Sequence, residues 1–231
     1  ELLVVAGEAS GDAMGAELVR AVRAIRPTHA FFGAAGPELA SAGVEQVVDT
    51  RELSVMGLFE VVGRLPAVWR ALATLEQAAA DRPADGAILI DSPDFNLRLA
   101  GRLAGRGIPV VQYVSPTVWA WRPGRVRVLE KSVRRLLVTL PFEPAFYEDT
   151  QVDAVYVGNP AIDRLPERPA PRAEVATRIG LPEEAPWVAI VPGSREGELR
   201  RQLRPRQWAL QPARAQDRQD RGVRDGRAHA T

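Results

Sequence analysis

The chain has 231 residues, of which 46% are hydrophobic and 26% are charged, with a net charge of +1; this composition is typical of a globular protein. It has no cysteine, which excludes disulfides and thiolate metal sites, and its only histidines are His29 and His229, which disfavours a histidine metal centre or a Ser-His-Asp triad. No apolar run approaches the roughly 18 residues that cross a bilayer. The length predicts one complete domain and part of a second.

The chain opens with a pattern of strand, glycine-containing loop and helix. An apolar run at residues 2–6 predicts a buried strand, and residues 13–25 predict a helix with one apolar face. The loop between them, GEASGD, fits neither the dinucleotide fingerprint nor the P-loop. Glu8 and Asp12 would repel a phosphate, so the loop favours sugar hydroxyls or a neutral ligand. The alternative is a tight turn in which Asp12 caps the helix.

A strongly apolar stretch follows the next elements, which we expect to be a strand at 30–34, a helix at 36–43 and a strand at 44–49. Its hydrophobic side chains cluster more densely than one buried helix face requires: Phe59, Val61, Val62, Leu65, Val68 and Trp69. One interpretation is core packing. The other is an interfacial patch that contacts a membrane, with neighbouring arginines facing anionic head groups.

A carboxylate stands at the end of the most apolar predicted strand, residues 87–90. Asp91 ends this run, Pro93 and Asp94 follow, and residues 95–106 predict a helix before a strand at 110–114. In open α/β sheets, ligands bind at the carboxyl ends of the strands. Asp91 is therefore a candidate functional acid, although a helix cap is the alternative.

The rest of the alternating pattern includes two tryptophans just after a strand. Trp119 and Trp121 could form the wall of a sugar pocket, or could simply pack. Further on we expect a basic helix at 123–132, a strand at 136–140, a helix from 141 and a strand at 154–157. Six or seven strands alternating with helices predict a Rossmann-like, doubly wound α/β fold with a parallel sheet.

The last third of the chain changes in character. We expect a linker at 164–186 with a short helix at 173–179, then a strand at 187–191 and a turn, PGSREGE, that contains Ser194 and Arg195. An arginine in such a turn is typical of a phosphate-binding helix start, so a second α/β domain begins here. Residues 200–231 contain nine arginines and three aspartates without helical or strand period. Since they lack interleaved aromatic residues, we do not expect a nucleic-acid partner.

Six motifs together resemble one family of enzymes: GEASGD, LSVMG, IDSPDFN, YVSPTVWAWR, LPFE and PGSR, in this order within residues 1–199. The family is lipid-A-disaccharide synthase. The resemblance implies a glycosyltransferase of the B type, with two Rossmann-like domains. It assigns residues 1–163 to the acceptor-binding domain, 164–186 to the linker and 187–199 to the start of the UDP-sugar-binding domain. Residues 200–231 match nothing expected, and their composition is typical of a truncated or frameshifted chain with a disordered tail.

The resemblance also implies the chemistry. The family transfers 2,3-diacylglucosamine from UDP to 2,3-diacylglucosamine 1-phosphate with inversion, without metal or cofactor, as a cytoplasmic enzyme peripheral to the inner face of the inner membrane. Asp91 matches its general base. The implied substrate-binding residues are Glu8, Ser10, Asp12, Trp119, Trp121, Ser194 and Arg195, and the implied membrane contacts are the six apolar residues from Phe59 to Trp69.

Two departures from the family pattern bear on activity. Gln112 and Asn159 stand where the family usually has histidines. Neither side chain can take up or release a proton near neutral pH, as a histidine can. The resemblance also implies a second domain that is much longer than residues 187–199, the part that matches it. The chain is therefore expected either to be a working transferase or to be an inactive fragment that only binds acceptor lipid or a membrane surface.

Overall fold

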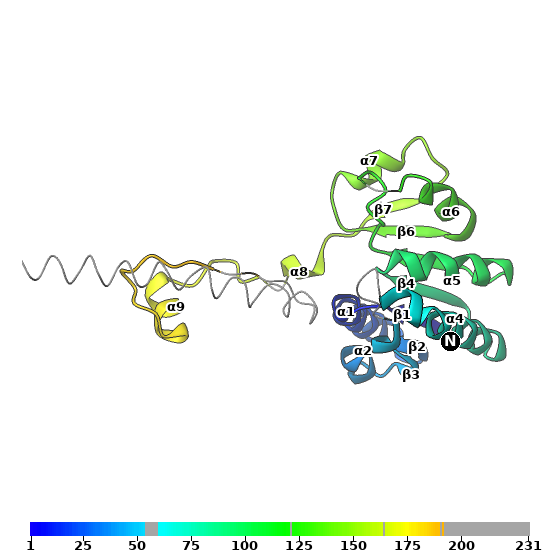
Figure 1. The fold of residues 1–231 in the computed structure, drawn as a ribbon, viewed down its shortest axis with the longest axis horizontal. Helices are drawn as coiled ribbons and strands as arrows, with labels where there is room; N and C mark the ends of the chain where they lie inside the picture. The colour runs from blue at the N-terminus through cyan, green and yellow to red at the C-terminus, as the bar shows by residue number, and fades with distance from the viewer. Residues whose placement is uncertain (54–59, 121, 164, 190, 192–231) are drawn as a thin grey trace, which may run out of the picture. The chain divides into compact units, whose positions relative to one another are not determined.

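The computed structural model describes residues 1–53, 60–120, 122–163, 165–189 and 191 (Figure 1). The chain divides into two compact units, Glu1–Glu167 and Arg168–Thr231. Each unit is described by itself below.

The first unit is built on one parallel sheet of seven strands in the order β3-β2-β1-β4-β5-β6-β7. Every adjacent pair is parallel. The strands are β1 Leu2–Ala6, β2 Phe31–Ala35, β3 Glu45–Asp49, β4 Gly86–Ile90, β5 Val110–Tyr113, β6 Arg135–Val138 and β7 Ala154–Tyr156. The predicted Rossmann-like, doubly wound fold is confirmed.

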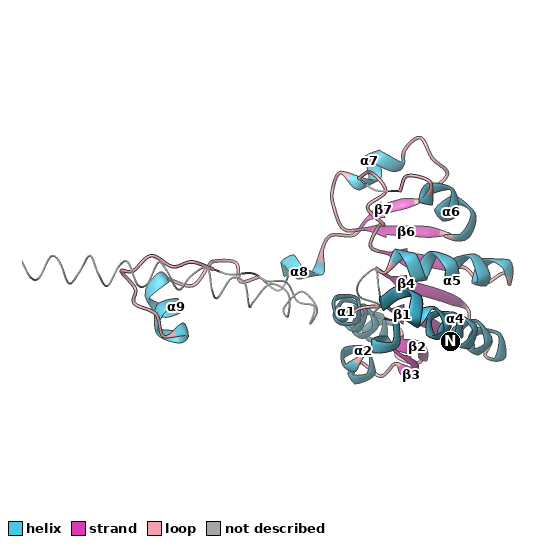
Figure 2. Cartoon of the chain, viewed as in Figure 1, coloured by secondary structure: helices cyan, strands magenta, loops and turns pink. Residues whose placement is uncertain are grey.

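Helices cover both faces of this sheet because each crossover between parallel strands carries one (Figure 2). The helices of this unit are α1 Ala9–Ile25, α2 Pro37–Ser41, α3 Thr50–Leu53, α4 Glu60–Asp81, α5 Pro93–Gly105, α6 Arg125–Ser132, α7 Glu143–Tyr147 and α8 Pro160–Asp163. In Figure 1, α1 and α2 lie on one side of β1 and β2, and α4 lies on the other.

Alternate residues of the central strands belong to two separate hydrophobic clusters. Leu3 and Val5 of β1 pack with α4 and α5, whereas Val4 and Ala6 pack with α1 and α2. Burial on both faces explains why the central strands read as continuous apolar runs rather than as alternating patterns.

The junction between β1 and α1 is shorter than expected. Helix α1 begins at Ala9, with Glu8 as an extended N-cap residue (φ −147°), whereas the sequence predicted a start near residue 13. Ser10 and Asp12 therefore lie in the first turns of a helix, and most of the GEASGD motif is not a loop.

The second unit contains the helix α9, Arg172–Ile179, which ends at Gly180 in the left-handed region (φ 69°). The guanidinium of Arg172 lies 3.9 Å from the ring centroid of Trp187 and donates hydrogen bonds to the carbonyls of Glu183 and Ala185. The strand expected at 187–191 is not found: residues 187–189 and 191 have no regular structure. A strand needs a neighbouring strand to bind its backbone groups, and the described residues of this unit provide none.

Candidate functional site

The point where the sheet changes winding direction lies between β1 and β4. The chain runs outward from β1 to β2 and β3 on one side, and from β4 to β7 on the other. Ala6 and Ile90, the last residues of these two central strands, are register partners, so the GEASGD and IDSPDFN motifs leave the sheet side by side. Ligands of doubly wound proteins bind at this kind of crevice.

Asp91 lies at this edge, as predicted, directly after β4. Its side chain is half-buried, and its backbone N–H donates to the carbonyl of Tyr113 at 2.9 Å. The backbone of Asp91 and that of Ser92 both have positive φ, 53° and 40°. The carboxylate is thus carried by a sharp turn at the sheet edge rather than by the strand itself.

A cleft of about 510 Å³ opens beside this turn. One part of its lining is apolar and comes from Leu53, Leu65, Val68 and Phe95. The other part is polar or charged and includes Glu8, Ser92, Asp94, Arg98 and Arg122. A cleft with an apolar wall and guanidinium groups suits a ligand that combines hydrocarbon with anionic or hydroxyl groups.

Asp94 joins two of the sequence motifs. It lies in the first turn of α5, whose N-cap residue, Ser92, makes no side-chain cap hydrogen bond. The Asp94 carboxylate accepts from Arg122 at 2.9 Å and also from Arg125. The ion pair with Arg122 ties the end of the YVSPTVWAWR motif to the start of α5.

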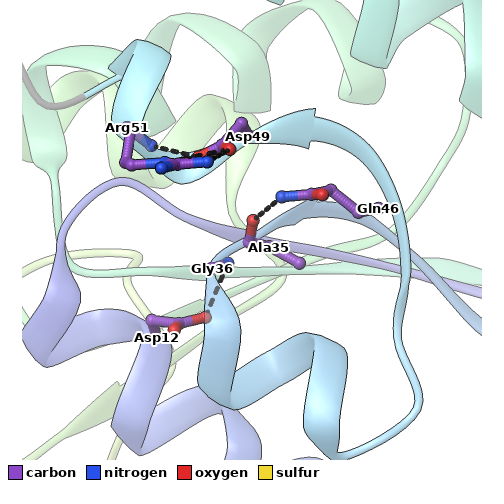
Figure 3. A network of polar contacts seen from close by, with 6 residues as sticks. All are labelled: Asp12, Ala35, Gly36, Gln46, Asp49 and Arg51. Carbon is purple, nitrogen blue, oxygen red and sulfur yellow. Dashed lines mark hydrogen bonds and ion pairs between the residues drawn. The ribbon is translucent and has the colours of Figure 1, made fainter.

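Asp12 is bound to helix α2 rather than exposed to solvent (Figure 3). Its side chain is 2% exposed. Oδ1 accepts from the N–H groups of Gly36 (2.8 Å) and Leu39 (3.2 Å), and Oδ2 accepts from Glu38 (2.9 Å). A cap was one predicted alternative for Asp12, but the helix that it caps is α2 and not its own helix.

The other two predicted residues of the first motif lie differently. Glu8 is half-buried and lines the cleft, while Ser10 is exposed on the first turn of α1. The structure thus brings Glu8 to the site and places Ser10 nearby on the chain.

The predicted aromatic wall is described only in part. Trp119 is 44% exposed and packs edge-to-face on Phe142 with centroids 5.3 Å apart; it does not line the cleft. Trp121, Ser194 and Arg195 lie outside the described residues.

The predicted membrane-contact residues divide into several groups. Leu65 and Val68 line the cleft, and Val68 also packs against the core. Trp69 is 50% exposed, with the guanidinium of Arg102 at 5.3 Å from its ring centroid. Val61 and Val62 belong to α4, but their side chains are outside the description, and Phe59 lies outside the described residues altogether.

Two buried tyrosines support the loops at this edge. Burial raises the pKa of Tyr113 at the end of β5. Burial also raises the pKa of Tyr147, whose hydroxyl is hydrogen-bonded to that of Ser115 at 2.8 Å. Both phenols are therefore neutral at physiological pH.

Sequence reasoning noted Gln112 only as a departure from the family pattern and missed Asn96, although both side-chain amides donate to the backbone carbonyl of Asp91. The signal was present: each is a polar residue inside an apolar run, between Phe95 and Leu97 and between Val111 and Tyr113. Elsewhere in the described part of the chain, no cluster of three or more histidine, cysteine, aspartate or glutamate side chains could hold a metal ion.

The strand order and the cleft at the winding change define a Rossmann-type ligand-binding domain of the doubly wound class. Within that class, the family is identified by sequence: the family model described as lipid-A-disaccharide synthetase matches residues 2–219. The chain belongs to this family. The match extends past residue 199, where we expected the resemblance to end.

Individual relatives agree with the family model. A lipid-A-disaccharide synthase of Myxococcus xanthus (strain DK1622) is 52% identical over 202 residues, which cover 87% of this chain and 52% of that protein. One of Anaeromyxobacter sp. (strain K) is 46% identical over 215 residues, covering 93% of this chain and 56% of that protein. The chain therefore spans about half the length of these curated relatives.

A solved structure, titled as that of the glycotransferase of kitacinnamycin, aligns with 84% of this chain and 56% of its own, at a TM-score of 0.46 and 16% identity. Among the described helices, none is both long and apolar enough to cross a membrane.

Proposed function

We propose that this chain carries the acceptor-binding half of a lipid-A-disaccharide synthase. The reaction would transfer 2,3-diacylglucosamine from UDP to the 6-hydroxyl of 2,3-diacylglucosamine 1-phosphate, giving the β(1→6) disaccharide 1-phosphate and UDP. The observation that carries the proposal is the cleft lined by Ser92, the chain neighbour of Asp91, because its apolar wall and its arginines match a lipid sugar phosphate. Membership of the family supports the reaction type.

Asp91 would act as the general base. Its carboxylate would take the proton of the acceptor hydroxyl while that oxygen attacks the anomeric carbon of the donor. The bond from that carbon to the UDP oxygen breaks, and the electron pair leaves with UDP, so the anomeric configuration inverts. One base is sufficient for a single displacement. Ser194 and Arg195 would bind the leaving diphosphate.

The two walls of the cleft suggest how the acceptor would be held. An acyl chain would lie against Leu65, Val68 and Phe95, and the 1-phosphate would face the arginines of the polar wall. Glu8 would orient a sugar hydroxyl. Ser10, Trp119 and Trp121 are the further substrate contacts, and Asp12 would contribute by holding α2.

The lipid substrates suggest where the protein works. We place it on the cytoplasmic face of the inner membrane, with Leu65 and Trp69 of α4 among the contacts to lipid, since both are exposed. The acceptor domain would comprise residues 1–163, with the linker at 164–186 and the UDP-sugar domain beginning at 187.

The test is release of UDP by the purified chain from UDP-diacylglucosamine in the presence of diacylglucosamine 1-phosphate. Asp91→Asn should lower kcat by about 10²–10⁴, the usual contribution of a general base. The matched control is Asp85→Asn, since Asp85 precedes the other end of β4 and pairs with the N-terminal ammonium at 2.6 Å. No release by the wild-type chain, or equal rates for the wild type and Asp91→Asn, would overturn the proposal.

A further inference from the structure

The turn that carries Asp91 has an unfavourable backbone. Asp91 and Ser92 are consecutive non-glycine residues with φ of 53° and 40°, and a left-handed conformation is unfavourable for L-residues other than glycine. Consecutive residues of this kind persist only where the surroundings hold them. The structure shows which side chains do so.

Asn96 binds the end of β4 from within α5. Its side chain is fully buried, and Nδ2 donates to the carbonyls of both Ile90 (3.0 Å) and Asp91 (2.7 Å). These two carbonyls flank the point where the strand stops, so one amide replaces the ladder partners that the strand loses there.

Gln112 binds the same turn from β5. It is also fully buried, and Nε2 donates to the carbonyl of Asp91 at 3.1 Å and to that of Val114 at 3.2 Å. Val114 has φ of 73°, an outlier for a β-branched residue. A single side chain therefore joins two left-handed strand ends.

The two buried amides are less favourable for stability than apolar side chains would be at these positions. Within the described residues, Oδ1 of Asn96 and Oε1 of Gln112 are buried without hydrogen-bond partners, so each atom loses the hydrogen bonds that it would make in water. Buried unsatisfied atoms next to backbone strain are characteristic of functional sites.

A third contact to the turn comes from Gly7, the residue directly after β1. A Cβ atom added to Gly7 would lie 2.1 Å from Oγ of Ser92, so the turn packs directly on the backbone of the first motif. The Asp91–Ser92 turn is thus fixed from α5, from β5 and from the end of β1.

We infer that Asn96 and Gln112 are positioning residues, which fix the direction of the Asp91 carboxylate by holding the backbone carbonyl of Asp91. Neither amide needs to contact substrate. This inference rests on the proposed role of Asp91 as the base. A base displaced by about 1 Å can lose about 10²-fold in rate, so a hydrogen bond to its backbone affects turnover as strongly as a direct contact does.

The decisive variant is Gln112→Met, which keeps the length of the side chain and removes the donor. Its control is Gln46→Met, because Nε2 of Gln46 also donates to a strand-end carbonyl, that of Ala35 at 2.6 Å (Figure 3). A restoring variant, Gln112→His, keeps a ring N–H donor.

The first readout is amide hydrogen exchange, which needs no turnover. The N–H of Asp91 is bonded to Tyr113, and those of Phe95 and Asn96 are bonded to the carbonyl of Ser92. In Gln112→Met these three amides should exchange at least about tenfold faster than in the wild type, while the amides of β1 and β2 keep their rates. Gln112→His should restore slow exchange, and Gln46→Met should leave these amides unchanged.

The second readout is kinetic. Gln112→Met should lower kcat by about 10- to 100-fold with KM changed less than about threefold. In an Asp91→Asn background the same substitution should have no further effect, because there is no base left to misplace. A merely structural role would lower the residual rate by the same factor in both backgrounds, and that result would overturn the inference.

The two proposals fail separately. Unchanged exchange at Asp91, Phe95 and Asn96 in Gln112→Met would overturn the positioning role, whatever the activity. Faster exchange in Gln112→Met, together with no UDP release by the wild-type chain, would support the mechanical role of Gln112 and refute the proposed function.

Discussion

The Asp12 carboxylate should contribute more to stability than any exposed acid of the chain, and Asp12→Ala tests this. The substitution removes the acceptor of three backbone N–H groups of α2. It leaves Gly36 and Leu39 with buried donors, since both of their hydrogen bonds to Asp12 are buried, while the Glu38 bond is only partly so.

The magnitude follows from this count. A buried donor without a partner costs about 1–3 kcal/mol, and water that enters the space of the lost carboxylate recovers part of that. We expect a loss of about 3 kcal/mol in the free energy of unfolding. Asp12→Asn should lose about half as much, because its oxygen still accepts from Gly36 and Leu39 but its NH₂ group faces the N–H of Glu38.

The assay is urea denaturation followed by far-UV circular dichroism, and the control is Asp49→Ala. Asp49 accepts from the N–H of Arg51 at 2.8 Å and from its guanidinium (Figure 3), but the Arg51 side chain is 88% exposed. Removal of the Asp49 carboxylate should lower the free energy of unfolding by about 1 kcal/mol, the ordinary contribution of an N-cap residue. Equal losses for Asp12→Ala and Asp49→Ala would refute the reasoning.

Two further predictions concern the site. Gly7→Ala should lower the free energy of unfolding by about 1–3 kcal/mol in the same assay, because the new Cβ would lie 2.1 Å from Oγ of Ser92. Gly105→Ala is the control and should be neutral or stabilising, because nothing lies within 4 Å of its new Cβ. A larger loss for Gly105→Ala than for Gly7→Ala would contradict the packing argument. Trp69→Glu should weaken co-sedimentation with anionic liposomes about tenfold, since it removes an exposed aromatic side chain of α4. Ile25→Glu, at the exposed end of α1, is the matched control, and equal weakening by both would argue against contact through α4.

The sheet could be predicted from the sequence because burial on both faces leaves a simple signal. Runs such as LLVVA and AILI are too apolar for exposed strands and too short for helices, and both became central strands within a residue of their expected bounds. The strand expected at 187–191 had the same composition. It is absent from the described residues, since composition selects a strand only where a neighbouring strand is available.

The partners of individual acids could not be predicted, because these partners come from distant parts of the chain. Asp12 binds amides 24 to 27 residues further along, and Asp94 pairs with arginines 28 and 31 residues away. A carboxylate at the start of a helix reads locally as a cap in every case. Which helix it caps, or whether an arginine takes it instead, depends on how the strands are ordered.

The acids of the two motifs at the winding change therefore have different physical tasks. At Asp12 the amides of α2 bind the carboxylate itself, so this charge is used to join two helices. At Asp91 the amides of Asn96 and Gln112 bind the backbone carbonyl instead. A motif acid with three backbone donors on its oxygens serves the fold, whereas Asp91 lies in a strained turn at the sheet edge, next to the cleft that Ser92 lines. This difference, which no sequence pattern shows, favours Asp91 over Asp12 as the residue that acts on substrate.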